Sequence, residues 1–227
     1  MHKPLTALLV GLVLAHAPTA SAQEVTPLDL GMLRNTEVSV VQKMAYSKER
    51  RSEIGVAIGL MPFDTATWTP LANGTFTLHR TETFGLELSL GGGYGLKTGT
   101  YKDLEGPAYG IAFEAYRFLG RAGVAVEWSP VYAKMNWRGQ RILHHDVFGI
   151  LGATATLEQC VLPGGSLAVG PGATVGVGAR VFRGERANVR LELRDDIFAE
   201  KRDLTSTIAV KQNVWIAAGL SWFSKGR

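Results

Sequence analysis

The chain has 227 residues, of which 46% are hydrophobic and 19% charged, and its formal net charge at pH 7 is +4. So small a positive charge gives no electrostatic reason to expect nucleic-acid binding, and the length is that of one domain. The lone cysteine, Cys160, has no partner for an internal disulfide. The fold must therefore be held by non-covalent contacts.

The first 22 residues have the pattern of a secretory signal peptide. Lys3 supplies a positive charge, residues 5–15 form an apolar run, and residues 20–22 (ASA) offer a small-x-small cleavage site. The apolar run is well short of the roughly 20 residues that a membrane-spanning helix needs, which argues against a retained anchor. We therefore expect export and cleavage after residue 22. Removing 22 of the 227 residues leaves 205 and a formal charge of +3, because Lys3 is the only charged residue lost.

Residues 23–52 are polar and mixed, and we expect them to form a periplasmic N-terminal segment. Residues 37–42 have the composition of a short strand. The charge run at 48–51 (KERR) is interpreted as a solvated face, with a lipid-headgroup site as the alternative.

From residue 53 the chain alternates between apolar and polar or small residues, which is the pattern of β-strands. The clearest example places Phe84, Leu86, Leu88 and Leu90 on one face. Counted in this way there are eight segments. They occupy approximately residues 53–60, 73–81, 84–96, 122–137, 142–157, 167–182, 188–198 and 207–223.

The last segment, 207–223, alternates over about ten residues and ends in aromatics, as transmembrane β-strands do. Its apolar face carries Val214, Ile216, Ala218, Leu220 and Trp222. We expect this strand to pair back onto the first one and so to close a barrel.

The connections between the segments alternate in length. The expected long ones are 61–72, 97–121, 158–166 and 199–206, and the short ones are 82–83, 138–141 and 183–186. Bacterial outer-membrane barrels have an even number of strands, short periplasmic turns and longer outer loops. The sequence therefore predicts an all-β fold, a single antiparallel up-and-down transmembrane β-barrel over residues 53–223 with about eight strands and a tail at 224–227. A soluble barrel or sandwich is the alternative.

Three features fit this pattern poorly. Pro130 and Pro171 lie inside predicted strands, where a closed barrel has no free edge for proline, so bulges or later strand starts are expected there. Residues 109–118 are apolar enough to form a strand. If they do, and if residues 128–131 make a turn, the barrel has ten strands.

If the apolar face meets lipid, charged side chains must fill the interior. An eight-stranded barrel is just wide enough to hold side chains, so the expected interior is a salt-bridged plug, with glycines of the segment 167–182 making room for it. The predicted interior charged network consists of Glu87, Glu127, His144, Asp146, Arg180, Arg190, Glu192 and Arg194. Aromatics expected at the membrane interfaces are Phe84, Tyr94, Tyr132, Trp137, Phe182, Trp215, Trp222 and Phe223.

No catalytic residue, metal site or cofactor is predicted. In the run 144–146 (HHD), only His144 and Asp146 share a strand face, and two ligands are too few for zinc. Residues 91–95 are glycine-rich but lack the Lys-Ser/Thr of a phosphate-binding loop. A lipid hydrolase built on Ser89, His79 and Glu87 is a weaker alternative.

Short motifs spread over residues 38–223 resemble those of a known family, the outer-membrane β-barrel domain proteins found mainly in myxobacteria and their relatives. The motifs are VVQ at 40–42, Arg51, MPFD at 61–64, LH at 78–79, LE at 86–87, WSPVYAK at 128–134, HD at 145–146 with Gly149 and Gly152, and VRLELRD at 189–195. Ala133 and Asp196 depart from the family pattern, which tends to have Gly and an aromatic there. The resemblance implies a location and a fold, and no catalytic residue.

We therefore expect a bacterial outer-membrane protein with a structural or surface-interaction role, and not an enzyme. The alternative is a narrow channel or small-solute conduit. The expected partners are outer-membrane lipid and other envelope proteins bound through the loops 61–72, 97–121, 158–166 and 199–206, with no nucleic acid.

Overall fold

The computed structural model describes residues 45–138 and 141–225, so the predicted signal peptide and the strand expected at 37–42 lie outside the described residues. The described part contains nine strands and one helix. They are β1 (Ser52–Met61), β2 (Thr67–His79), β3 (Phe84–Gly93), β4 (Leu96–Lys97), α1 (Gly99–Glu105), β5 (Tyr116–Trp137), β6 (Arg141–Cys160), β7 (Leu167–Phe182), β8 (Ala187–Lys201) and β9 (Ile208–Phe223).

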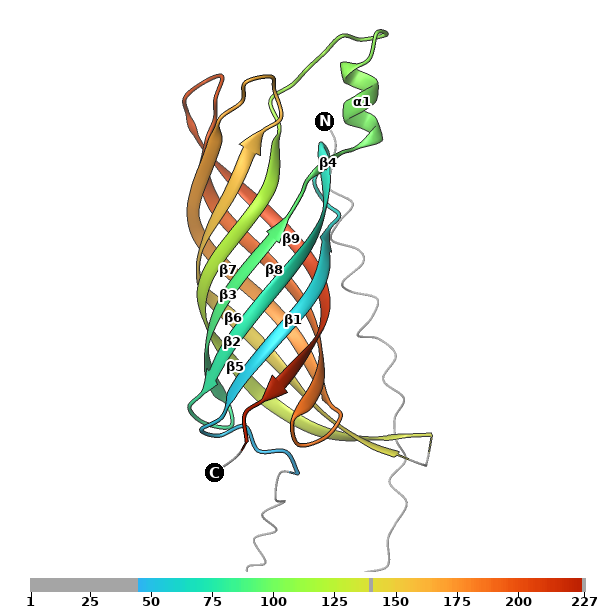
Figure 1. Ribbon diagram of the computed structural model, residues 1–227, viewed down its shortest axis with the longest axis vertical. Coiled ribbons are helices and arrows are strands. Elements are labelled where there is room, and N and C mark those ends of the chain that lie inside the picture. Colours follow the sequence, from blue (N-terminus) through green and yellow to red (C-terminus); the bar gives the residue numbers. More distant parts are fainter. Residues whose placement is uncertain (1–44, 139–140, 226–227) are drawn as a thin grey trace, which may run out of the picture. The chain divides into compact units, whose positions relative to one another are not determined.

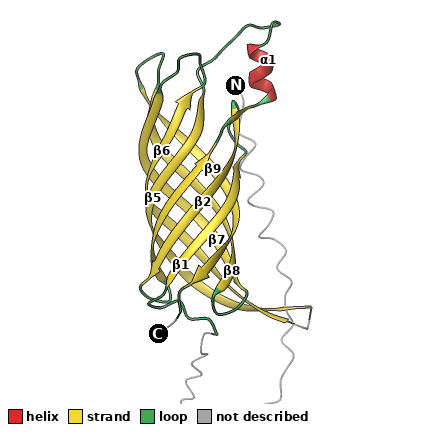
Figure 2. Cartoon of the chain, viewed as in Figure 1, coloured by secondary structure: helices red, strands yellow, loops and turns green. Residues whose placement is uncertain are grey.

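Eight of the strands form a closed antiparallel ring (Figure 1, Figure 2). Neighbours in sequence pair around the ring, and β1 pairs on one side with β2 and on the other with β9. The seam between β1 and β9 runs from the pair Glu53–Phe223 to the pair Leu60–Ile216. The predicted eight-stranded up-and-down barrel, closed by the last strand on the first, is confirmed. The two-residue β4 only extends the end of β2.

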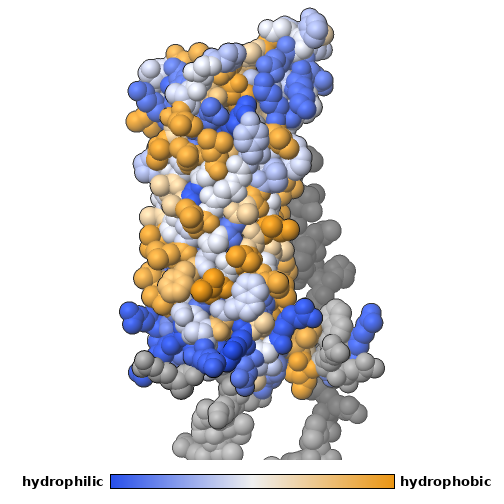
Figure 3. Space-filling view, in the orientation of Figure 1, coloured by the Kyte–Doolittle hydropathy of each residue, from blue (hydrophilic) through white to orange (hydrophobic). Residues whose placement is uncertain are grey.

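Polarity in this barrel is the inverse of that in a water-soluble fold (Figure 3). Outward-facing Ile58 and Val210 are 75% and 74% exposed, whereas inward-facing Glu53 and Arg180 are both 0% exposed. Orange, apolar side chains cover the wall of the barrel, and blue ones gather at its two ends. An apolar outer band around a polar interior is the arrangement of a transmembrane barrel, because acyl chains solvate the first and the ring encloses the second. In the described part of the chain, no helix is long and apolar enough to cross a membrane.

The two ends of the barrel differ in their connections. One end, here called the turn end, carries the connections 80–83, 138–140 and 183–186 together with the start of β1 and the end of β9. The other end, here called the loop end, carries 62–66, 94–115, 161–166 and 202–207. Each loop-end connection is longer than each turn-end one, as predicted.

The predicted loops 61–72, 97–121, 158–166 and 199–206 are nevertheless too long, because the strands continue into them. In β2, for example, Thr67 and Thr69 are buried in the lumen while Trp68 and Pro70 face outward. The alternation is interrupted because Pro70 has the character of a strand breaker and the inward-facing Leu71 is apolar, so periodicity does not join this segment to the rest of β2.

Both prolines lie within strands. At Pro130 the β5–β6 register shifts between Trp128 and Val131, which is the expected bulge. Pro171 pairs with β6, but the ladder between β7 and β8 begins only at Gly172. On the β8 side, Pro171 therefore lies just beyond the ladder, where its lack of an N–H costs no strand pairing.

The ten-strand alternative is wrong. Residues 128–131 continue β5, and β5 begins only at Tyr116, so most of 109–118 belongs to a loop-end connection.

Candidate functional site in the barrel interior

Arg180 on β7 lies in the lumen near the turn end and contacts carboxylates from three other strands. Its guanidinium nitrogens are 3.0 Å from Glu53 on β1, 2.8 Å from Glu127 on β5 and 2.8 Å from Asp146 on β6. All four side chains are buried. An arginine presents five N–H donors in a rigid plane, so one guanidinium can bind several carboxylates at once.

Arg190 and Arg194 on β8 extend this cluster along the barrel. Arg190 lies 3.1 Å from Glu87 on β3 and 2.7 Å from Glu192, and Arg194 lies 2.7 Å from each of the same two carboxylates. Each acid is therefore shared by two cations, and the pairs form a continuous network.

The network ends toward the loop end at Arg121, Asp196 and Trp215. Arg121 is 2.7 Å from Asp196, and the indole N–H of Trp215 donates to the same carboxylate over 3.2 Å. The guanidinium groups of Arg121 and Arg194 lie 5.2 and 5.3 Å from the Trp215 ring centroid. At that distance the ring face attracts both cations.

At the turn end, the segment that precedes β1 closes the network. Lys48 is 3% exposed and its ammonium donates to Asp146. Tyr46 stacks on Phe182, with ring centroids 5.4 Å apart. The interpretation of residues 48–51 as a solvated face is therefore wrong for Lys48, although the Arg50 side chain does lie in solvent.

We call these buried charged side chains and His79 the lumen network. Its acids are Glu53, Glu87, Glu127, Asp146, Glu192 and Asp196, and its cations are Lys48, Arg121, Arg180, Arg190 and Arg194. His79 completes it, with Nε2 2.8 Å from Glu53. Buried charges are tolerated only when they are paired, and removing one partner leaves another uncompensated. The numbers of buried acids and buried cations must therefore be nearly equal for this interior to be stable.

Glycines on β7 make room for these large side chains. A Cβ on Gly178 would lie 2.4 Å from the Phe148 ring, and one on Gly176 would lie 2.8 Å from the Arg194 side chain. Both distances are too short for a real contact. The Phe148 ring in turn lies 4.9 Å from the guanidinium groups of Arg180 and Arg190.

An apolar layer crosses the lumen above the network. Met61, Leu71, Phe118 and Ala217 pack with Trp215 into one buried cluster. Beyond it, toward the loop end, Glu158 accepts hydrogen bonds from Lys211 over 2.7 Å and from Asn213 over 2.7 Å. A cavity of about 150 Å³ lies beside this second polar cluster, with Asp64 and Thr67 also in its wall.

Seven of the eight residues predicted for the interior lie together in the lumen network. The eighth, His144, does not join it. Its Nδ1 is hydrogen-bonded to the Tyr132 hydroxyl at 2.9 Å, and its ring packs edge-on against Tyr46. The reason is position, because His144 shares a face with Asp146 but pairs with the last residue of β7, at the rim of the barrel.

Sequence reasoning missed five members of the network, namely Lys48, Glu53, His79, Arg121 and Asp196. Alternation offered a signal for Glu53, which faces opposite to Ile54. The aromatic prediction holds for Phe84, Tyr94 and Trp222, which are exposed. It is wrong for Trp215, Phe182 and Phe223, which are buried in the lumen; Tyr132 is half-buried, and the Trp137 side chain lies outside what the structure describes.

The residues of the weaker hydrolase alternative have other partners. His79 binds Glu53, Ser89 accepts from Arg121 over 3.1 Å, and Glu87 binds Arg190 and Arg194. Within residues 45–138 and 141–225, no group of three or more His, Cys, Asp or Glu side chains is arranged to hold a metal ion.

At the loop end, Glu114 and Asp203 tie three connections together. Burial by itself would raise the pKa of the Glu114 carboxyl, but hydrogen bonds from the Tyr116 hydroxyl and from the amides of Leu204 and Asp203 outweigh it, so that this pKa lies below its usual range. Hydrogen bonds from the hydroxyl and the amide of Ser166 likewise lower the pKa of the Asp203 carboxyl.

A closed antiparallel ring with lipid-facing apolar residues and a filled polar lumen defines the class of small transmembrane β-barrels. No protein-family model and no curated protein sequence matches the chain. Among solved structures, the chain is similar to the outer membrane protein OprG from Pseudomonas aeruginosa, with a TM-score of 0.51 at 12% identity, over 81% of this chain and 100% of that one.

The N-terminal β-barrel domain of Pseudomonas aeruginosa OprF gives a TM-score of 0.49 at 10% identity, over 78% of this chain and 98% of that one. Ail, the attachment invasion locus protein of Yersinia pestis, gives 0.43 at 12% identity, over 78% and 99%. At these identities the likeness to OprG supports a shared fold and nothing finer.

Proposed function

We propose that this chain is a bacterial outer-membrane protein whose barrel is a closed scaffold that presents its loop end as an interaction surface, without catalysis of its own. The observation that carries this proposal is the filling of the lumen. The lumen network and the apolar layer around Trp215 occupy successive levels of the barrel with buried side chains. A lumen packed with paired charges favours a scaffold over an open conduit.

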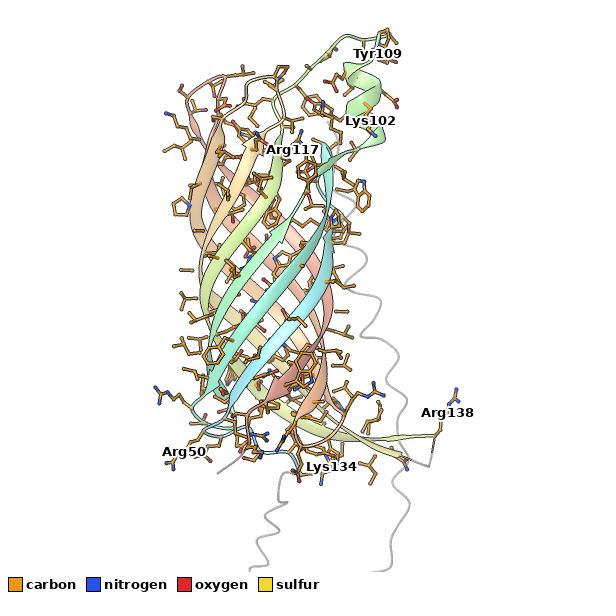
Figure 4. The ribbon with its side chains drawn as sticks, viewed as in Figure 1. Arg50, Lys102, Tyr109, Arg117, Lys134 and Arg138 are labelled. Carbon is orange, nitrogen blue, oxygen red and sulfur yellow. The ribbon has the colours of Figure 1, made fainter. Side chains whose placement is uncertain are left out.

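The loop end has the features of a contact surface. Large apolar side chains are exposed there, including Phe63 at 68%, Tyr109 at 65% and Leu204 at 69%. Figure 4 shows Tyr109 and Lys102 on the connection that carries α1, beyond the rim of the ring. Exposed apolar residues rimmed by polar ones are typical of sites that bind another protein. The turn end would then face the periplasm, as short connections and strand termini do in such barrels.

The channel alternative rests on one observation, the 150 Å³ cavity lined by Asp64, Glu158 and Lys211 at the loop end. Planar-bilayer recordings separate the two functions. The refolded barrel should be electrically silent at protein-to-lipid ratios at which a trimeric porin gives clear steps. Reproducible single-channel steps that disappear in a Glu158→Gln/Lys211→Met variant would instead show that the barrel is a channel and that its path passes this cavity.

The surface role is tested by a photo-crosslinking amino acid at Tyr109, with the same group at Arg183 on the turn end as the matched control. Incorporation at Tyr109 should give an adduct of defined mass in intact cells, and incorporation at Arg183 should not give the same adduct. Equal adducts at both positions would contradict the proposal that the loop end is the interaction surface.

The proposal includes export by a signal peptide cleaved after residue 22 and membership of the barrel family of myxobacterial type. The supporting features are the pattern of residues 1–22 and the motifs between residues 38 and 223. Mass spectrometry of the protein extracted from purified outer membranes should give an N-terminus at Gln23. Recovery of the chain in the soluble fraction would contradict the localisation.

A further inference from the structure

The hairpin of β5 and β6 continues past the turn end of the ring as a two-stranded ribbon (Figure 1). The ladder between β3 and β5 ends at Trp128, and the ladder between β6 and β7 ends at His144. The pairing between β5 and β6 nevertheless runs on from Val131–Val147 to Trp137–Arg141. Residues 131–137 therefore have no strand on their other side. In Figure 1 this ribbon leaves the barrel sideways at the level of the turn-end connections.

One face of the ribbon continues the lipid-facing wall of the barrel. The bulge at Pro130 adds one residue without changing direction, so that Val131 pairs with Val147 and both remain outward-facing and exposed. The face then follows every second residue. Its members are Val131, Ala133, Met135, Leu143, His145 and Val147. Five of these six are apolar, and Met135 is 43% exposed although it is no longer part of the ring.

The opposite face and the tip are polar and basic. That face holds Tyr132, Lys134, Asn136, Ile142 and His144, among which Ile142 is the one aliphatic side chain. At its base Tyr132 pairs with Asp146, which is buried in the lumen and binds Arg180. Lys134 and Arg138 are exposed, and Figure 4 shows Arg138 at the tip of the ribbon, away from the ring, and Lys134 below the turn end. Between residues 128 and 145 the sequence contains no Asp or Glu. An apolar face joined to basic residues is the pattern of a segment that lies in the membrane interface, with its cations on anionic headgroups.

The other use of such a ribbon would be to add an extended peptide to the free edge of β5. That edge carries Pro130 at its start and Lys134 in its middle, and proline and lysine are the residues with which proteins prevent strand addition. Continuity with the lipid-facing wall also points to lipid. We propose that the ribbon 131–137 and 141–143 lies on the membrane surface at the turn end, with Val131, Met135 and Leu143 at the headgroup–acyl boundary and Lys134 and Arg138 on the phosphates of anionic lipids. This rests on the proposed membrane location of the barrel.

The test uses nitroxide labels on full-length barrels with Cys160→Ser, placed in nanodiscs of phosphatidylcholine with or without phosphatidylglycerol. Met135→Cys carries the label on the apolar face, and Asn136→Cys is its matched control on the polar face. Position 135 should be accessible to oxygen and shielded from an aqueous nickel chelate, and position 136 should show the reverse. Equal access of the chelate to both positions would place the ribbon in water and overturn the proposal.

The charge requirement is tested in the same labelled protein by Lys134→Glu with Arg138→Glu. Chelate access at position 135 should rise several-fold, and only when phosphatidylglycerol is present; Lys102→Glu, on the loop end, should change nothing. If those amides of residues 131–136 that point away from β6 are instead protected from hydrogen exchange without lipid, strand addition is the better account. All variants should keep the heat-dependent gel migration of the folded barrel, so failure of this contact is distinguishable from failure of the proposed function.

Discussion

Arg180 binds carboxylates that belong to three different strands, so it acts as a cross-brace of the ring as well as a counter-ion. An exposed pair contributes little because water and salt screen it, whereas a buried pair cannot lose one member without leaving the other unsolvated. Arg180 therefore matters for stability mainly because its removal would leave three buried carboxylates without this cation.

We predict that Arg180→Met lowers the free energy of unfolding by about 3–5 kcal/mol, because Glu53, Glu127 and Asp146 lose a shared cation in the lumen. Urea titration of the barrel in phospholipid vesicles measures this change. The matched control is Arg183→Ala, at an exposed arginine on the neighbouring turn, with an expected change within about 0.5 kcal/mol. Addition of Glu127→Gln to Arg180→Met should restore part of the loss; an unchanged midpoint in the single variant would contradict the cross-brace.

Among the elements, the loop-end connections are held by hydrogen bonds to carboxylates as well as by a small buried apolar cluster of Ala66, Tyr101, Ala115 and Val161. Glu114 accepts from the Tyr116 hydroxyl over 2.6 Å and from the Leu204 amide over 3.3 Å, and Asp203 accepts from the Ser166 amide over 2.9 Å. These contacts join 94–115, 161–166 and 202–207 at the outer rim.

Acid should break these hydrogen bonds at the loop end. Because the pKa values of Glu114 and Asp203 are lowered in the folded protein, their contribution is complete above the ordinary carboxyl range near about 4 and is lost as the pH falls through the lowered values. The amide NMR signals of Ser166, Asp203 and Leu204 should therefore shift together below about pH 4. In Glu114→Gln the titration seen at Leu204 should disappear while that at Ser166 persists. Signals that move only above pH 5 would refute this assignment.

The bulge in β5 is a second feature at this scale. Because Ser129 and Pro130 together oppose one residue of β6, removing Pro130 restores one-to-one pairing and leaves every other residue on its present face. Deletion of Val126, which lies in a regular part of both ladders, would instead turn Glu127 toward lipid.

We predict that the chain without Pro130 still folds, and that the chain without Val126 does not. The measurement is gel migration of detergent-refolded protein before and after boiling, together with far-ultraviolet circular dichroism. Equal folding of the two deletion variants would mean that the register of β5 does not decide the fold.

Alternation predicted those parts of the barrel in which one face is apolar and the other polar, such as the segment 84–90. It could not predict strand ends such as Thr67–Leu71, where Pro70 interrupts the strand pattern and the apolar Leu71 faces the lumen, so that the hydrophobic contrast between the two faces is lost. The network was predicted where ions alternate repeatedly with apolar residues, as in 189–194, whereas the single acid Glu53 at the start of β1 was missed. Lys48 was not, because it enters the lumen from outside the strands and no periodicity marks it. Trp215 was predicted at the membrane interface because it is aromatic. Its position between the outward-facing Val214 and Ile216 would have placed it in the lumen.

For the whole molecule, closure of the ring decides whether the barrel can exist in a membrane. An open edge would leave unpaired N–H and C=O groups in hydrocarbon, at a cost of several kcal/mol for each group. The closing ladder joins β1 to β9, and its middle contains the pair Ala57–Gly219. The two strands approach closely at this point. A Cβ on Gly219 would lie 2.2 Å from the Val56 carbonyl oxygen and 2.7 Å from the Ala57 Cα.

We predict that Gly219→Val prevents closure, since a valine side chain there must push β9 away from β1 and so break ladder bonds that lipid cannot replace. The matched control is Ala218→Val, one residue earlier on the exposed, outward-facing side of the same strand, where lipid accommodates the added methyl groups. In unboiled samples Ala218→Val should show the migration of the folded barrel, and Gly219→Val should migrate as the boiled chain does. Because both variants place a valine side chain at neighbouring positions of the same strand, identical behaviour of the two would show that tight contact at this seam is not what closes the ring.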